Sequence, residues 1–178
     1  MAKPSDKDGK KTAGGKPAAA DPRTRDEISP ARQLSILVVD DDPVDRMTVL
    51  RALKGTKLNP QTTEAADIAS AVELIRKNAF DVIMLDHVLP DGKSLDLLRK
   101  IRDAGIRIPV IITTGFGDEM LVADLLRTGA ADYLPKPFDR VLLRARIGAC
   151  LENKRLHDQE VAYLAQISLE KKRADDLL

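Results

Sequence analysis

The sequence predicts an α/β protein: a doubly wound, parallel, five-stranded sheet of the (βα)5 kind, with helices on both faces. Short apolar runs alternate along the chain with segments whose apolar residues fall at helical spacing. The runs consist of Val, Ile and Leu with little polar alternation, which is typical of parallel strands covered on both faces. With no Trp, two Tyr and three Phe, the core must be built mainly from aliphatic side chains.

The order of these segments gives the elements of the fold. The expected strands are Ser35–Val39, Pro60–Thr63, Asp81–Leu85, Val110–Thr113 and Asp132–Leu134. The expected helices are Pro43–Lys54, Ala66–Lys77, Lys93–Ala104, Asp118–Thr128 and a last helix from Asp139 onward. Right-handed crossovers join successive strands into one sheet, and ligands of such sheets bind at the carboxyl ends of the strands.

Two further segments flank the globular region, which we expect over residues 33–151. Residues 1–32 contain one large aliphatic residue after Met1, Ile28, so they cannot bury enough apolar surface to fold and are expected to form a disordered tail. Residues 152–178 lack Gly and Pro and are expected to extend the last helix. A partly heptad spacing there makes a coiled-coil linker possible, through Leu164, Ile167, Lys171, Ala174 and Leu178.

Composition narrows the classes of function. Hydrophobic residues make up 43% of the chain and charged residues 32%, and no apolar stretch reaches the roughly 20 residues that span a bilayer. The net charge of +1 creates no field that would gather nucleic acid. The single cysteine, Cys150, and the lack of a secretory signal favour the cytoplasm. Partners are therefore expected to be proteins, not nucleic acid or membrane.

Polar residues follow the expected strands at the carboxyl edge of the sheet. They are Asp40, Asp41 and Asp42 after the first strand, Asp86 after the third, Thr113, Thr114 and Gly115 at the fourth, and Lys136 with Pro137 after the fifth. Clustered carboxylates favour a hard dication, and Mg²⁺ fits this set. An aspartate beside such an ion can attack phosphorus, with a lysine and a hydroxyl stabilising the phosphoryl oxygens.

Local chemistry separates the roles within the acidic triplet. Asp42 precedes Pro43, a pattern typical of an N-cap residue followed by proline at the first helical position. Asp40 and Asp41 therefore remain as candidate metal ligands.

Four motifs in this order carry a resemblance to a known family. ILVVDDDP, DVIMLDHVLPDG, PVIITTG and DYLPKPF resemble the CheY-like receiver domain of two-component response regulators over about Leu34 to Leu151. The resemblance implies a signalling switch that accepts a phosphoryl group on Asp86 from a histidine kinase or a phosphotransfer protein, and that turns over no other substrate. Residues 152–178 resemble the signalling helices that link receivers to output modules.

The resemblance also implies roles for single residues. Asp41 and Asp86 would bind Mg²⁺ directly, Asp40 through water, and Val88 through its backbone carbonyl. Thr114 and Lys136 would contact the phosphoryl group, Tyr133 would change rotamer with Thr114, and the Lys136–Pro137 bond would be cis. The signal would pass through the face of the fourth helix, fifth strand and last helix, with homodimerisation or a downstream output domain.

Some features depart from the usual pattern of the family, and three residues outside the site are expected to have ordinary structural roles. The turn Asp91–Ser94 is built differently from the usual one, and Val88 is apolar where polar groups are common. His87 and His157 are expected on solvated faces, and Cys150 is expected to pack in the core.

Two other functions stay open. A Mg²⁺-dependent phosphohydrolase would use similar chemistry, but such enzymes carry the nucleophile on the first strand. A receiver that serves only as a dimerising scaffold would keep the same site unused.

Overall fold

The computed structural model describes residues 33–54, 60–115, 119–137 and 139–175. The predicted tail over residues 1–32 lies outside the described residues, and so does Leu178, the last residue of the partly heptad spacing. Residues 1–32 and 33–178 form separate units, and the sheet and helices belong to the second.

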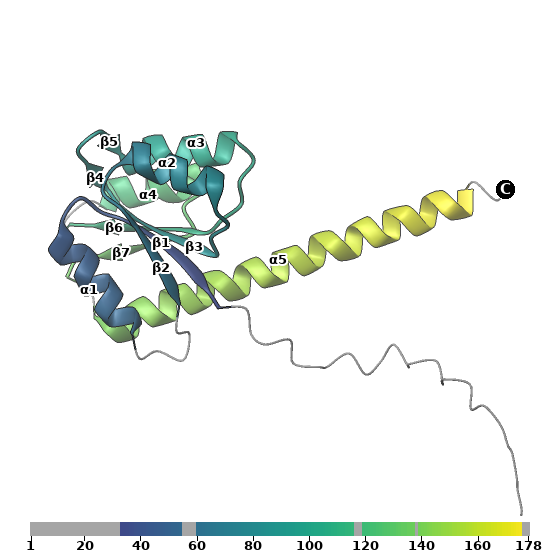
Figure 1. The fold of residues 1–178 in the computed structure, drawn as a ribbon. Coiled ribbons are helices and arrows are strands. Elements are labelled where there is room, and N and C mark those ends of the chain that lie inside the picture. Colours follow the sequence, from purple (N-terminus) through teal and green to yellow (C-terminus); the bar gives the residue numbers. More distant parts are fainter. Residues whose placement is uncertain (1–32, 55–59, 116–118, 138, 176–178) are drawn as a thin grey trace, which may run out of the picture. The chain divides into compact units, whose positions relative to one another are not determined.

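A parallel five-stranded sheet forms the centre of the fold, with strand order β2-β1-β3-β6-β7 (Figure 1). The strands are β1 (Ser35–Val39), β2 (Gln61–Ala65), β3 (Val82–Asp86), β6 (Val110–Thr114) and β7 (Asp132–Pro135). The predicted fold class is confirmed. The bounds of β1 are as predicted, and the ends of the other strands differ by at most two residues. The difference is largest at β2, because this edge strand is largely polar and carries little apolar signal.

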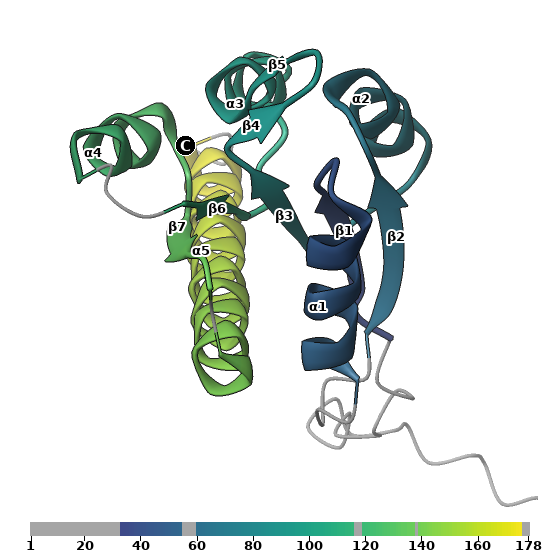
Figure 2. The same ribbon diagram turned by 90° about the vertical axis from the view of Figure 1, so that its left-hand side faces the viewer.

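Helices cover both faces of the sheet. They are α1 (Pro43–Leu53), α2 (Ile68–Lys77), α3 (Ser94–Asp103), α4 (Glu119–Thr128) and α5 (Arg140–Asp175). Figure 2 shows α1 and α5 on one face and α2, α3 and α4 on the other. Alternate strand residues point to the two faces, so the sheet divides the core in two. Leu37, Ile83 and Ile112 pack toward α2, α3 and α4, whereas Ile36 and Met84 pack toward α1 and α5.

Side-chain caps fix where the helices start. The Asp42 carboxylate accepts from Val44 N at 2.8 Å, which confirms it as the N-cap of α1. Asp67 caps α2 by accepting from Ser70 N at 2.7 Å. Such caps satisfy backbone donors that have no partner inside the helix.

A small hairpin that the sequence did not predict follows β3. It pairs β4 (Val88–Leu89) with β5 (Gly92–Lys93), and two-residue strands are too short to show a periodic pattern. Gly92 has φ +155°, and a Cβ there would lie 2.8 Å from Ile68 Cδ1. This turn therefore requires glycine, because a side chain would strain the backbone and collide with α2.

The last helix continues well past the sheet. α5 is a single helix of 36 residues that crosses the expected boundary between residues 151 and 152 without a break. Its first half contributes Leu143, Ile147 and Cys150 to the core, so the expected packing role of Cys150 is confirmed. From Glu152 to Asp175 every side chain except Lys154 is exposed. Among the described helices, none has the length and apolar character needed to cross a bilayer.

Candidate functional site

Three carboxylates meet at the carboxyl edge of the sheet. Asp40 directly follows β1 and Asp86 ends β3, and the register that pairs Val39 with Leu85 places these two acids side by side. Oxygen atoms of Asp40, Asp41 and Asp86 all lie within 4.8 Å of one another. Asp40 is buried at 3% exposure, Asp86 is half-buried and Asp41 is exposed. The structure thus brings together the three acids proposed from sequence as metal ligands.

Lys136 follows the edge strand β7 and reaches this cluster at the same carboxyl edge of the sheet. Its Nζ lies 2.8 Å from Asp40 Oδ2 and 3.2 Å from Asp86 Oδ1. The backbone helps to place it: Lys136 N donates to Thr114 O at 2.7 Å, and the Lys136–Pro137 bond is cis, as expected. A lysine far away in sequence therefore joins the acids.

Burial and charge shift the pKa values of this cluster. Burial raises the pKa of the Asp86 carboxyl; attraction to Lys136 opposes this rise and repulsion from Asp40 adds to it. Burial alone would lower the pKa of the Lys136 ammonium, but its hydrogen bonds to Asp40 and Asp45 and the charge of Asp86 hold that pKa above its ordinary value. Asp86 is thus a carboxylate whose charge the fold opposes, and Lys136 is a firmly charged ammonium.

Thr114 and Tyr133 lie on neighbouring strands. Thr114 ends β6 and is buried at 4% exposure, and it pairs with Pro135 of β7. Tyr133 is the second residue of β7, is partly buried and pairs with Ile112. Both therefore lie in the part of the sheet next to the acids. Their roles as phosphoryl contact and rotamer switch stay predictions.

The loop after Asp86 is held by side-chain contacts. Asp86 Oδ1 accepts from His87 N at 2.9 Å, and Val88 starts β4 with 62% of its surface exposed. Asp91 accepts from Ile68 N at 2.8 Å and Ala69 N at 3.0 Å, which ties the loop to the start of α2. The loop that carries the proposed Val88 ligand is therefore anchored at two points.

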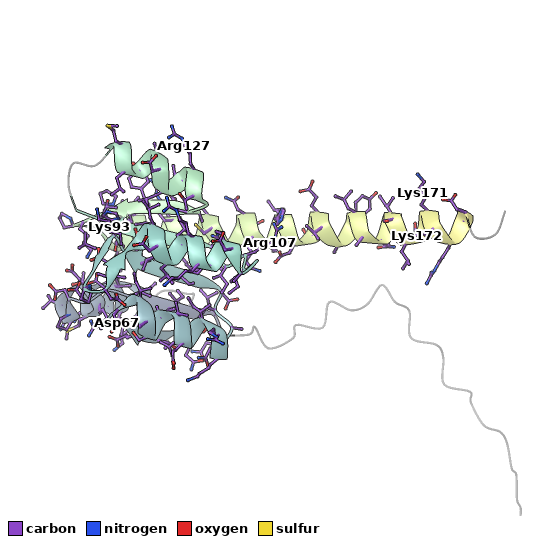
Figure 3. All side chains as sticks on the ribbon, turned by 90° about the horizontal axis from the view of Figure 1, so that it is seen from above. Asp67, Lys93, Arg107, Arg127, Lys171 and Lys172 are labelled. Carbon is purple, nitrogen blue, oxygen red and sulfur yellow. The ribbon has the colours of Figure 1, made fainter. Side chains whose placement is uncertain are left out.

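The structure differs from the solvated environment expected for His87. Its Nδ1 lies 2.8 Å from the hydroxyl of the fully buried Ser94, because the hairpin turns this side chain back onto α3. His157 is exposed on α5, as expected, and its Nε2 lies 3.4 Å from Arg107 Nη1. Figure 3 shows Arg107 beside α5 and labels Lys171 and Lys172 near the far end of that helix.

Two residues at the site were not identified from the sequence. Asp45 Oδ2, in the first turn of α1, lies 2.7 Å from Lys136 Nζ. Arg46 Nη1 donates to the carbonyls of Asp40 and Asp41 at 2.7 and 3.2 Å, and its Nε pairs with Glu64 at 2.9 Å. The sequence signal that could have identified Asp45 and Arg46 is their position in the first helical turn after the acidic triplet Asp40, Asp41 and Asp42. Side chains of that turn point back toward the end of the preceding strand.

The donor set suits a magnesium ion. Three carboxylates with oxygens this close repel one another, and one ammonium does not balance three negative charges. Mg²⁺ favours a few carboxylates together with waters, and Asp41 is exposed enough to leave room for water. Asp40, Asp41 and Asp86 could therefore hold such an ion.

Comparison with known proteins identifies the family. The family model described as the response regulator receiver domain matches residues 36–148. The chain belongs to the response regulator receiver family. This receiver is 37% identical over 128 residues to the response regulator MprA of Mycobacterium ulcerans, covering 71% of this chain and 54% of that protein.

A second relative and a solved structure support the same family. The cell cycle transcriptional regulator CtrA of Caulobacter vibrioides is 32% identical over 128 residues, covering 72% of this chain and 54% of that protein. The receiver domain of the Francisella response regulator 1452 has a TM-score of 0.63 and 30% identity, covering 68% of this chain and 98% of that one. The receiver described here spans about half the length of the first curated relatives it matches.

Proposed function

We propose that this receiver accepts a phosphoryl group on Asp86, in the presence of Mg²⁺, from a histidine kinase or a phosphotransfer protein. The single observation that carries the proposal is the meeting of Asp86 with Asp40, Asp41 and Lys136 at one edge of the sheet. Membership of the receiver family supports this assignment.

The chemistry is an in-line displacement at phosphorus. A carboxylate oxygen of Asp86 forms the new P–O bond while the P–N bond of the donor phosphohistidine breaks, and the leaving imidazole takes a proton. Lys136 and Thr114 stabilise the phosphoryl oxygens by charge and by a hydrogen bond. Bound Mg²⁺ would neutralise charge between the carboxylates and the phosphoryl group. Asp40, Asp41 and the Val88 carbonyl would hold the ion together with Asp86.

Intact-protein mass spectrometry tests the proposal. The protein is incubated with Mg²⁺ and acetyl phosphate, and we expect the mass of one phosphoryl group to be added. Asp86→Asn should abolish the addition, because the amide is not a nucleophile for phosphorus. Omission of Mg²⁺ should suppress it in the wild type. An adduct that survives Asp86→Asn contradicts the assignment.

The chain is proposed to turn over no other phosphoester. A phosphohydrolase of the aspartyl-phosphate type would instead hydrolyse p-nitrophenyl phosphate repeatedly. The absence of multiple turnover with this substrate would support a signalling switch. Sustained turnover would support the phosphohydrolase hypothesis instead.

The phosphorylated state is proposed to be relayed through the face of α4, β7 and α5 and then along α5. Residues 152–175 of α5 expose six large apolar or aromatic side chains that a lone helix in water would not favour. They are Leu156, Val161, Tyr163, Leu164, Ile167 and Leu169. Leu156, Tyr163, Leu164 and Ile167 fall on one side of the helix, and burying them against a second copy is the simplest arrangement. Phosphorylation would shift the equilibrium between two states of this helix pair.

Sedimentation with and without beryllofluoride, a phosphoryl mimic, tests this relay. We expect the mimic to tighten a dimer and Leu164→Glu to weaken it. Ala165→Glu adds the same charge at an exposed position on the opposite side of the helix from Leu156 and Ile167, so it should change the dimer little. If beryllofluoride leaves the dimer affinity unchanged, the result would favour a receiver that serves only as a dimerising scaffold over a phosphorylation switch.

A further inference from the structure

Lys136 has one more acidic partner than the proposed chemistry requires. Its Nζ lies 2.7 Å from Asp45, 2.8 Å from Asp40 and 3.2 Å from Asp86, so its contact with the phosphoacceptor is the longest of the three. Asp40 directly follows β1, and Asp45 lies in the first turn of α1. Two of the three carboxylates therefore draw the ammonium toward α1 and away from Asp86.

Asp45 is not needed to cap α1 or to bind the metal. Its side chain is 40% exposed, and the ion pair with Lys136 is its only contact among the hydrogen bonds and ion pairs of the described residues. The start of α1 is already capped by Asp42. Asp45 is also outside the group of three carboxylates that could hold a metal ion. Apart from a favourable place in the first turn of α1, its charge serves to contact Lys136.

That contact competes with the phosphorylated state. A phosphoryl group on Asp86 extends beyond the carboxylate and needs the ammonium of Lys136 beside its oxygens. To follow it, Lys136 must give up part of its contact with Asp45. The negative charge of Asp45 would also repel an incoming phosphoryl group, so both effects act in the same direction.

We propose that Asp45 is a positioning residue that holds Lys136 toward α1 in the unphosphorylated receiver and thereby restrains the phosphorylated state. The inference rests on the proposed phosphorylation of Asp86 and adds a regulator to that site. Neutralising Asp45 should favour the phosphoryl-bound state about fivefold, the upper range for an ion pair of this exposure.

The test measures beryllofluoride affinity by calorimetry at saturating Mg²⁺. We expect Asp45→Asn to bind about fivefold more tightly than the wild type. Asp45→Glu keeps the negative charge at this partly exposed position, so its affinity for beryllofluoride should be close to that of the wild type. Glu73→Gln removes a carboxylate of α2 that pairs with Lys77 on the same helix, so it should leave the affinity unchanged.

A second measurement follows Lys136 directly and needs no phosphoryl mimic. Acetylation of Lys136 by an amine-reactive reagent, read by peptide mass, should be faster in Asp45→Asn than in the wild type. Circular dichroism checks that each variant is folded.

The outcomes separate the inference from the function on which it rests. If the wild type binds beryllofluoride and Asp45→Asn binds it equally or more weakly, Asp45 is no restraint, and the proposed function stands. If the wild type binds no beryllofluoride at saturating Mg²⁺, the phosphorylation proposal fails and this inference fails with it.

Discussion

Replacing Asp86 with asparagine should make the metal-free protein more stable. Asp86 has an oxygen within 4.8 Å of an oxygen of the buried Asp40, and this repulsion amounts to about 3.5 kcal/mol at an effective dielectric constant of about 20. Its attraction to Lys136 at 3.2 Å amounts to about 5 kcal/mol on the same scale. Burial is the largest cause that raises the pKa of Asp86, and together with the repulsion from Asp40 it outweighs the attraction to Lys136, so the charge of Asp86 destabilises the metal-free fold.

We expect Asp86→Asn to raise the free energy of unfolding by about 1–2 kcal/mol at pH 7 in EDTA. Lys136 keeps Asp40 and Asp45 as partners in this variant, so the substitution leaves no buried charge alone. The assay is urea unfolding followed by circular dichroism, since the chain has no Trp. Asp42→Asn is the matched control, because asparagine caps a helix as well as aspartate does.

The advantage of Asp86→Asn should depend on pH with a definite sign. The folded-state pKa of Asp86 is raised, so the wild type is stabilised by protonation below its unfolded-state pKa and loses that stability as pH rises through the folded-state value. The gain from the variant is thus largest above the folded-state pKa and vanishes in acid. Excess Mg²⁺ should stabilise the wild type more than the variant. A variant less stable than wild type in EDTA at pH 7 refutes this electrostatic account.

Three further predictions concern the rest of the fold. Arg102→Ala should cost about 2–4 kcal/mol of stability in urea unfolding, because the guanidinium donates to the carbonyls of Gly129, Ile106 and Ile108; a cost below about 1 kcal/mol would contradict that role. Gly92→Ala should destabilise by about 1–3 kcal/mol through backbone strain and collision, read as a lower melting temperature; no change would mean that the turn adapts. Burial raises the pKa of Cys150 to about 11, so Ellman's reagent at pH 8 should label it only after unfolding; rapid labelling of the native protein would contradict its burial.

Much of the fold could be predicted from the sequence because its signals are local. The runs over residues 36–39 and 110–112 are apolar throughout, which indicates buried strands, and parallel pairing then follows from the intervening helices. The proximity of Asp40, Asp41 and Asp86 could also be predicted, because the carboxyl ends of parallel strands lie at one edge of the sheet. Asp42 could be assigned as a cap from the following proline alone.

What could not be predicted depends on contacts between distant segments. The contact of Asp45 with Lys136 joins residues 91 positions apart and requires the rotation of α1 on the sheet to be known. The bonds from Ile68 and Ala69 to Asp91 depend likewise on where the hairpin meets α2. No periodicity in the chain encodes such distances.

Chemical mapping of the phosphorylated residue tests the central claim most directly. Borohydride reduces an aspartyl phosphate to homoserine, and peptide mass spectrometry then locates the changed residue. After treatment with Mg²⁺ and acetyl phosphate, we expect homoserine at position 86 and none at Asp40, Asp41 or Asp45. Homoserine at one of those three acids, or at no position, would contradict the account.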